Sequence, residues 1–156
     1  MPLYDQEKMV KLVSELRKSV ARLRPIGQLP FAEFLKDPDK IGSSKYHFIV
    51  AFESCIDMCS HVIARNGYRV PDNYGDTFIV MCEAGAYDSN FAEELRNMAK
   101  FRNRLVHLYW ELDDRQLFDI LQNRLDDFKK FLDYIARFLE WESRKLYNQD
   151  KPDGTP

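Results

Sequence analysis

The chain has 156 residues, of which 45% are hydrophobic and 31% charged. This length lets one domain bury a core without disulfides or metals, so we expect a single globular domain over residues 1–147. The polar, breaker-rich segment 148–156 is expected to be a disordered tail. The net charge of −2 and the pI near 5.9 argue against a protein that coats nucleic acid. Local positive charge around Lys100, Arg102 and Arg104 still suffices for a site that binds one or two phosphates.

Hydropathy and cysteine content bear on where the protein is located. No uninterrupted apolar run approaches the ~18 residues of a membrane span, and the first residues lack the pattern of a secretion signal. We therefore expect a cytoplasmic protein that does not associate with a membrane. Cys55, Cys59 and Cys82 are an odd number of cysteines, so no disulfide framework is expected. Cys55 and Cys59 lie one helical turn apart without a matching second pair, and we interpret them as buried structural thiols.

Hydrophobic periodicity predicts the helices in chain order. They are expected over residues 5–23, 31–35, 39–66 and 73–84, from about 90 into the segment 101–110, and from 113 to 139. Pro25 is expected to end the first helix, and Gly67 to cap the end of the long third one. Capping-box patterns place the starts of the last two helices at Asn90 and Asp113.

The order of these elements defines the fold class. No stretch shows the sustained two-residue alternation of a half-buried strand, so no sheet is predicted. Short connections between long helices make neighbouring helices antiparallel. The sequence therefore predicts an all-α fold, an antiparallel up-and-down helical bundle of four main helices plus short helices.

A charged residue interrupts the apolar stripe of the predicted fifth helix. Arg102 falls on the same stripe as a set of apolar residues at three- and four-residue steps, namely Phe91, Leu95, Met98, Leu105 and Tyr109. Burial of an unpaired charge is costly, so such an Arg is paired, lies at the rim of a core, or faces a site that anions visit. The structural alternative is an Arg that snorkels or pairs at a subunit interface.

The residues after Arg102 extend this position into a motif. Asn103 follows directly, His107 and Tyr109 come five and seven positions later, and an acidic turn occupies 111–114. The spacing Arg-x-x-x-x-His-x-Tyr resembles the signature of the HepT-like toxins, a branch of the HEPN superfamily. The resemblance extends from the first helix to about Leu146, because the order and lengths of the apparent helices also match. It implies the helical bundle fold of HEPN domains.

The motif carries the groups that cleavage of RNA requires. A histidine can transfer protons near neutral pH, and the planar fork of an arginine can bind a phosphate through two parallel hydrogen bonds. The resemblance implies a metal-independent endoribonuclease with Arg102 and His107 as its catalytic pair. Asn103 is a supporting residue that can fix a base, a phosphate oxygen or His107 itself. No cofactor and no metal site are predicted, because His47 and His61 lack a complete set of ligand partners.

The spacing within the motif raises a geometric difficulty. Five residues on an ideal helix turn the chain by roughly 140°, so Arg102 and His107 would point in different directions. Either the helix loosens near His107, or a second copy of the chain completes the site. HEPN proteins commonly dimerise with two motifs facing one cleft, so the resemblance favours a homodimer. Such a pair would supply one His as base and the other as acid.

Tyr109 is the candidate regulatory residue. It lies seven positions beyond Arg102 and is expected to return to nearly the same azimuth of the helix. The structural alternative is a core aromatic whose hydroxyl is satisfied. In HepT-like proteins the Tyr at this place accepts AMP from a minimal nucleotidyltransferase, so the resemblance implies that Tyr109 is the AMPylation acceptor. The added phosphate and bulk would occupy the RNA site beside Arg102.

These observations lead to one main hypothesis and one alternative. The main hypothesis is the toxin component of a toxin–antitoxin system, an endoribonuclease whose antitoxin is a minimal nucleotidyltransferase. The alternative is a non-catalytic helical module that binds a nucleotide or a partner and assembles with the nucleotidyltransferase. The acidic pI and the lack of an evident RNA-binding platform favour the alternative, and the presence of both Arg102 and His107 favours catalysis.

Overall fold

The computed structural model describes residues 2–141, so the expected tail at 148–156 and the last part of the predicted domain, 142–147, lie outside the described residues. Within that range the chain forms helices and no strand. In order they are α1 (Gln6–Gly27), α2 (Phe31–Leu35), α3 (Pro38–Asn66), α4 (Tyr74–Glu83), α5 (Ser89–His107), the 3-10 helix η1 (Tyr109–Glu111), α6 (Asp114–Asn123) and α7 (Asp126–Phe138).

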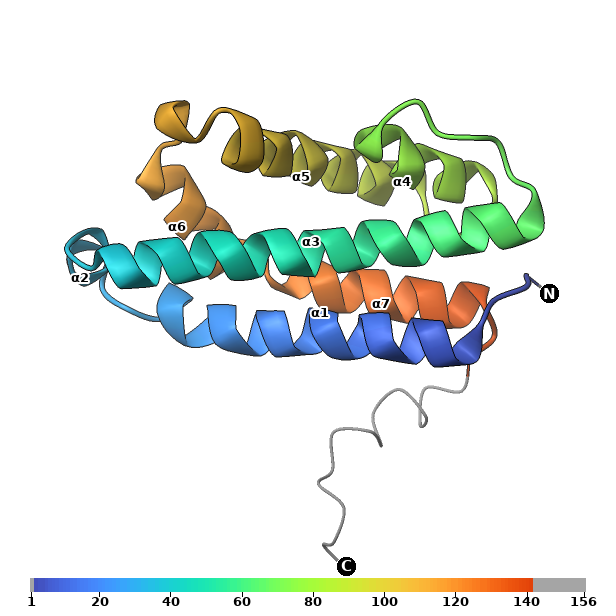
Figure 1. Cartoon of the computed structure of the whole chain (residues 1–156), viewed down its shortest axis with the longest axis horizontal. Helices are drawn as coiled ribbons and strands as arrows, with labels where there is room; N and C mark the ends of the chain where they lie inside the picture. The colour runs from blue at the N-terminus through green and yellow to red at the C-terminus, as the bar shows by residue number, and fades with distance from the viewer. Residues whose placement is uncertain (1, 142–156) are drawn as a thin grey trace, which may run out of the picture.

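The four main helices lie lengthwise alongside one another, which confirms the predicted all-α antiparallel bundle. Figure 1 shows α1, α3, α5 and α7 in this arrangement, with α4 beside α5 and with the short α2 and α6 at one end. Close helix pairs include α1 with α3 and α4 with α5. The motif helix α5 is therefore held between α4 on one side and α3 on the other.

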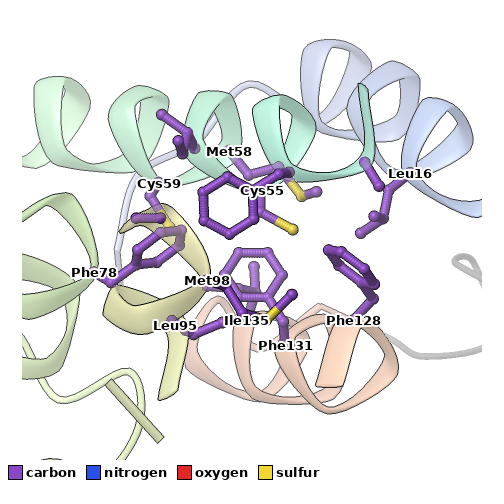
Figure 2. Close-up of a cluster of buried hydrophobic side chains, with 14 of the residues drawn as sticks. Leu16, Cys55, Met58, Cys59, Phe78, Leu95, Met98, Phe128, Phe131 and Ile135 are labelled. Carbon is purple, nitrogen blue, oxygen red and sulfur yellow. The ribbon is translucent and has the colours of Figure 1, made fainter. Parts of the chain in front are cut away.

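Aromatic and sulfur-containing side chains fill the centre of the bundle. Figure 2 shows Phe78 of α4, Phe131 of α7 and the two thiols of α3 converging on one cluster. The ring centroids of Phe78 and Phe131 lie 6.3 Å apart, nearly perpendicular, an arrangement that aromatic pairs favour. Cys55 and Cys59 are buried and free, as predicted, and burial raises the pKa of Cys59 far above its ordinary value. They are therefore core residues.

The central helix α3 is the most apolar element. By length and composition it could cross a membrane, since an 18-residue window has a mean hydropathy of 1.3. However, 61% of that window is buried inside the protein. A helix with neighbours on most sides is apolar over most of its circumference, so its composition follows from its central place in the bundle.

The end of α1 and the start of α5 differ from the sequence-based prediction. Pro25 does not end α1, which continues through Gly27. Ile26 is buried there, and a Cβ at Gly27 would lie 2.6 Å from the backbone oxygen of Leu121, so close packing against α6 accompanies the extra turn. The second difference is at the start of α5, where the side chain that accepts the Phe91 N–H at 2.8 Å belongs to Asp88 and not to Asn90.

The predicted last helix is two helices, α6 and α7, with the break at Arg124 and Leu125. The break lets α6 pack against α1 and α2, where Phe118 lies 4.9 Å from Phe34 between ring centroids. Apolar periodicity continues across the break, which is why the sequence did not reveal it. The predicted caps at Asp113 and Gly67 are confirmed, Asp113 accepting the Arg115 N–H and Gly67 adopting φ 64°.

Candidate active site

The side chain of Arg102 on α5 contacts residues of two other helices, α3 and α4. This side chain is only 12% exposed, and its Nη2 donates to Oε1 of Glu53 on α3. Nη1 donates to Oδ1 of Asn103 at 3.1 Å, and the guanidinium lies 4.8 Å from the ring centroid of Tyr74 on α4. An ion pair, a hydrogen bond and a cation–π contact therefore hold the guanidinium in one place.

The contacts of Arg102 explain how a cation occupies the apolar stripe of α5. Glu53 offsets its charge, which is the paired state that the sequence analysis considered, here within one chain. A guanidinium has five N–H donors, and two of its nitrogens each make one of the hydrogen bonds described above. Each Nη nitrogen carries a second N–H, so one donor on each Nη is not used by these two hydrogen bonds. The buried Nε makes no hydrogen bond with the described residues.

Glu53 and Tyr74 are site residues that the sequence analysis did not identify. For Glu53 a signal existed, because residues 48–59 contain only two charged side chains, Glu53 and Asp57. A carboxylate within such an apolar stretch requires a cation nearby, and Arg102 was the other charged residue on an apolar stripe. For Tyr74 no sequence signal pointed to Arg102.

His107 is the last residue of α5, and the structure does not bring it to Arg102 within the chain. The helix is continuous from Ser89 to His107, so the roughly 140° divergence expected for five residues stands. The helix does not loosen before it ends at His107, and Leu108 is the first non-helical residue. The imidazole is exposed, without a hydrogen bond, ion pair or ring contact to any residue in 2–141. It is therefore free to meet a substrate or a second chain.

Asn103 supports Arg102 instead of His107. Of the roles that the sequence left open, the contact present is the hydrogen bond from Arg102 at 3.1 Å. Asn103 is exposed, and its two amide N–H groups remain as donors. The acidic pair that followed the motif is also engaged elsewhere, since Asp113 caps α6 and Asp114 forms an ion pair with Lys45 at 3.7 Å.

The predicted placement of Tyr109 on the apolar stripe of α5 is wrong. The helix ends at His107, and Leu108 takes φ −126° and ψ 40°, so the azimuth of Arg102 is not continued to Tyr109. Tyr109 begins η1, is 65% exposed, and contacts the ring of Trp110 edge-on at 5.3 Å. It is not a core aromatic. Its hydroxyl is on a part of the chain that another enzyme can reach.

The other histidines and the thiols form no metal centre in the part of the chain that the structure describes. No group of three or more His, Cys, Asp or Glu side chains there could hold an ion. His61 is buried, and its Nε2 accepts the Asp5 backbone N–H at 2.8 Å. Burial, with the cations Lys8 and Arg65, lowers the pKa of His61. Burial likewise lowers the pKa of His47, with a smaller effect of Arg22.

Comparison with known proteins identifies the class of protein. Residues 16–135 match the family described as Ribonuclease HepT-like. The matched segment is most of the chain, so this protein belongs to the HepT-like family, and the resemblance drawn from the motif is confirmed.

Individual relatives are consistent with this family. The mRNA nuclease HepT of Shewanella oneidensis is 29% identical over 83 residues, which are 53% of this chain and 62% of that relative's length. A putative RNase of Archaeoglobus fulgidus is 27% identical over 108 residues, 69% of this chain and 81% of that protein. The solved structure of a tri-AMPylated Shewanella oneidensis HEPN toxin bound to an MNT antitoxin superposes with a TM-score of 0.79 at 21% identity. The superposition covers 85% of this chain and 99% of that one, which confirms the fold.

Proposed function

We propose that this chain is a metal-independent endoribonuclease, the toxin of a two-gene toxin–antitoxin system whose antitoxin is a minimal nucleotidyltransferase. The observation that carries the proposal is Arg102, held in place by Glu53 and Asn103 with spare donors, in a chain of the HepT-like family. The names of the relatives, an mRNA nuclease and a HEPN toxin bound to an antitoxin, point the same way. A cytoplasmic location without membrane association is part of this proposal.

The chemistry divides between two residues. Arg102 binds the scissile phosphate and stabilises the negative charge that grows on its oxygens during the displacement. His107 accepts the proton of the attacking 2′-hydroxyl, or donates one to the leaving 5′-oxygen, because an imidazole exchanges protons near neutral pH. Asn103 keeps Arg102 oriented through its 3.1 Å hydrogen bond. No metal has a role in this scheme.

A homodimer completes the site. Arg102 and His107 diverge on a regular helix, so one chain does not aim both groups at one phosphate. Two chains that face each other through their motif helices supply an Arg and a His from different copies, and two histidines for the two proton transfers. Light scattering at micromolar concentration is expected to give twice the mass of the chain. A fully active monomer would refute this arrangement.

Substitution of the catalytic pair tests the activity. Arg102→Ala and His107→Ala are each expected to lower RNA cleavage by ~10²-fold or more, with unchanged helical content by circular dichroism. Cleavage by the unmodified chain should persist in excess chelator. The matched control is Arg24→Ala, which removes the same charge in the last turn of α1 and breaks an exposed ion pair with Asp126. Full cleavage by either catalytic variant would disprove the proposed mechanism.

Regulation of the site is assigned to Tyr109. Its 65% exposure lets a nucleotidyltransferase reach the hydroxyl, and covalent AMP there would put phosphates within the motif. The chain purified with the product of its neighbouring gene is expected to be heavier by AMP units and inactive. The chain purified alone should be unmodified and active.

A second candidate function is a non-catalytic module that binds a nucleotide or the nucleotidyltransferase. The observation that favours it is the Arg102–Glu53 pair, which offsets the charge that would attract RNA. The two candidates differ in one measurement, since only the ribonuclease cleaves RNA when the chain is purified without its partner. Binding of the nucleotidyltransferase with no cleavage under any condition would select the module.

A further inference from the structure

A hollow of about 400 Å³ lies beside the motif, between the first turn of α4 and one face of α5. Its lining includes the motif residue Asn103, which accepts the hydrogen bond from Arg102. The hollow therefore adjoins the catalytic guanidinium through a shared side chain. None of the roles assigned to the motif uses this space.

Two cations project along the α5 side of the hollow. Arg96, Lys100 and Asn103 are spaced by four and three residues, so they share one helix face over roughly 10 Å of its length. Lys100 is exposed and has no hydrogen-bond or ion-pair partner among residues 2–141. Arg96 forms an exposed ion pair with Glu93, whose Oε2 lies 3.3 Å from Nε. The Nε atom of Arg96 is buried. Its contact with Glu93 does not have hydrogen-bond geometry, so Nε makes no hydrogen bond with the described residues.

The first turn of α4 is built to let Arg96 lie across it. Gly75 is buried, and a Cβ at this position would come within 2.9 Å of Cγ of Arg96. The adjacent Tyr74 packs under the guanidinium of Arg102. Two arginines of α5 thus lie against successive residues in the first turn of α4.

The lining of the hollow also contains two acidic residues, Asp72 and Asp76. Asp76 accepts two hydrogen bonds from Arg69, at 2.7 and 3.1 Å, and this pairing lowers the pKa of Asp76. Its charge is therefore already offset. Asp72 is the remaining carboxylate in the lining. The cations that a phosphodiester would meet here are Lys100, which has no ion-pair partner among the described residues, and Arg96, which shares its charge with Glu93.

We propose that this hollow binds the RNA backbone next to the scissile phosphate, with Lys100 and Arg96 contacting phosphates of the strand that Arg102 holds for cleavage. The inference rests on the proposed ribonuclease function and adds a substrate subsite to it. Lys100 and Arg96 bind and position the strand without taking part in proton transfer. Their contribution is independent of base sequence, since it involves only the backbone.

The test combines RNA binding with cleavage. The variants are Lys100→Ala and Arg96→Gln, of which the second keeps the Cγ that packs on Gly75. Binding of a short, labelled, mixed-sequence single-stranded RNA is measured as a function of salt in a His107→Ala background, so that the probe stays intact. Cleavage of the same RNA is measured with His107 present. The control is Lys11→Ala on α1, a 75% exposed side chain outside the hollow.

The double variant Lys100→Ala with Arg96→Gln is expected to weaken RNA binding about tenfold and to reduce the salt dependence by about 0.7 per lost phosphate contact. KM for cleavage should rise while kcat changes little, and Lys11→Ala should behave like the parent. Unchanged binding and KM in a chain that does cleave RNA would overturn the subsite and leave the proposed function intact. Impaired binding of the nucleotidyltransferase with normal RNA binding would also overturn it and assign the hollow to the protein partner. A parent chain that neither binds nor cleaves RNA would refute the proposed function and the subsite together.

Discussion

Glu53 is predicted to stabilise the fold through Arg102, and this can be measured as a pairwise energy. Both side chains are less than a third exposed, at 29% and 12%. A hydrogen bond to a charged group contributes ~1.5–3 kcal/mol, and breaking a fully buried pair costs ~3–5 kcal/mol. Glu53→Gln retains an acceptor of the same shape and loses only the charge. We therefore expect the free energy of unfolding to fall by ~1–2 kcal/mol and Tm to fall by roughly 2–8 °C.

A double-mutant cycle isolates this interaction. The four proteins are the parent, Glu53→Gln, Arg102→Met and the double variant, each unfolded by denaturant and followed by circular dichroism. Arg102→Met places an apolar chain on the apolar stripe of α5 but leaves Glu53 without its cation, so its stability should fall by ~1–2 kcal/mol along with loss of cleavage. Glu53→Gln should then have little further effect, which gives a coupling energy of ~1–2 kcal/mol.

Asp57→Asn is the matched control on the same helix. Burial and the neighbouring charge of Glu53 raise the pKa of Asp57, so removal of its charge should not destabilise the protein. A coupling energy below ~0.3 kcal/mol between Glu53 and Arg102 would refute the reasoning, because Arg102 would then owe its position to other contacts. An equal decrease in the free energy of unfolding for Glu53→Gln and Asp57→Asn would also refute the reasoning.

Three further predictions concern other parts of the molecule. Tyr109→Phe should cleave RNA normally but escape inactivation by the nucleotidyltransferase with ATP, and a gain of AMP in its intact mass would exclude Tyr109 as the acceptor. The folded-state pKa of His61 is lowered below 6.5 while its Nε2 accepts the Asp5 N–H, so the stability it contributes is present above that value and is lost as pH falls through the lowered pKa. His61→Gln keeps an acceptor that does not titrate, so denaturation at ~pH 7 and ~pH 5 should show a smaller loss of stability than in the parent. Gly27→Ala should destabilise by ~1–3 kcal/mol because its Cβ would lie 2.6 Å from a backbone oxygen of α6, whereas Gly42→Ala, with nothing within 4 Å, should stabilise by ~0.5–1 kcal/mol.

Features that depend on near neighbours in the chain were predictable. The helices predicted from hydrophobic periodicity, the C-terminal cap at Gly67 and the N-terminal cap at Asp113 were expected and are present. Each depends on residues within about one turn, where side chains and backbone groups meet whatever the rest of the fold does. The motif that identified the HepT-like family is equally local, a run of eight residues from Arg102 to Tyr109.

Helix ends were less predictable, because packing between helices decides them. Pro25 lies within α1 because the following turn packs against α6. The break at Arg124 leaves no trace in the apolar pattern, since both α6 and α7 bury their apolar faces in the same core. Because α5 ends at His107, Tyr109 lies at the surface and not on the apolar stripe of α5, where it was predicted. In each case the local preference was weaker than the contacts made by the folded chain.

The sequence by itself determined the all-α class, the HepT-like family, and Arg102 and His107 as the two residues proposed for catalysis. It also showed that Arg102 is paired, lies at the rim of a core or faces a site that anions visit, because an unpaired cation on an apolar stripe is costly. Only the tertiary structure decided that the partner of Arg102 is Glu53, which lies 49 residues earlier in the chain, and that Arg96 and Lys100 border a hollow against α4. Such contacts join helices that are distant in sequence, and their geometry depends on how the whole bundle packs.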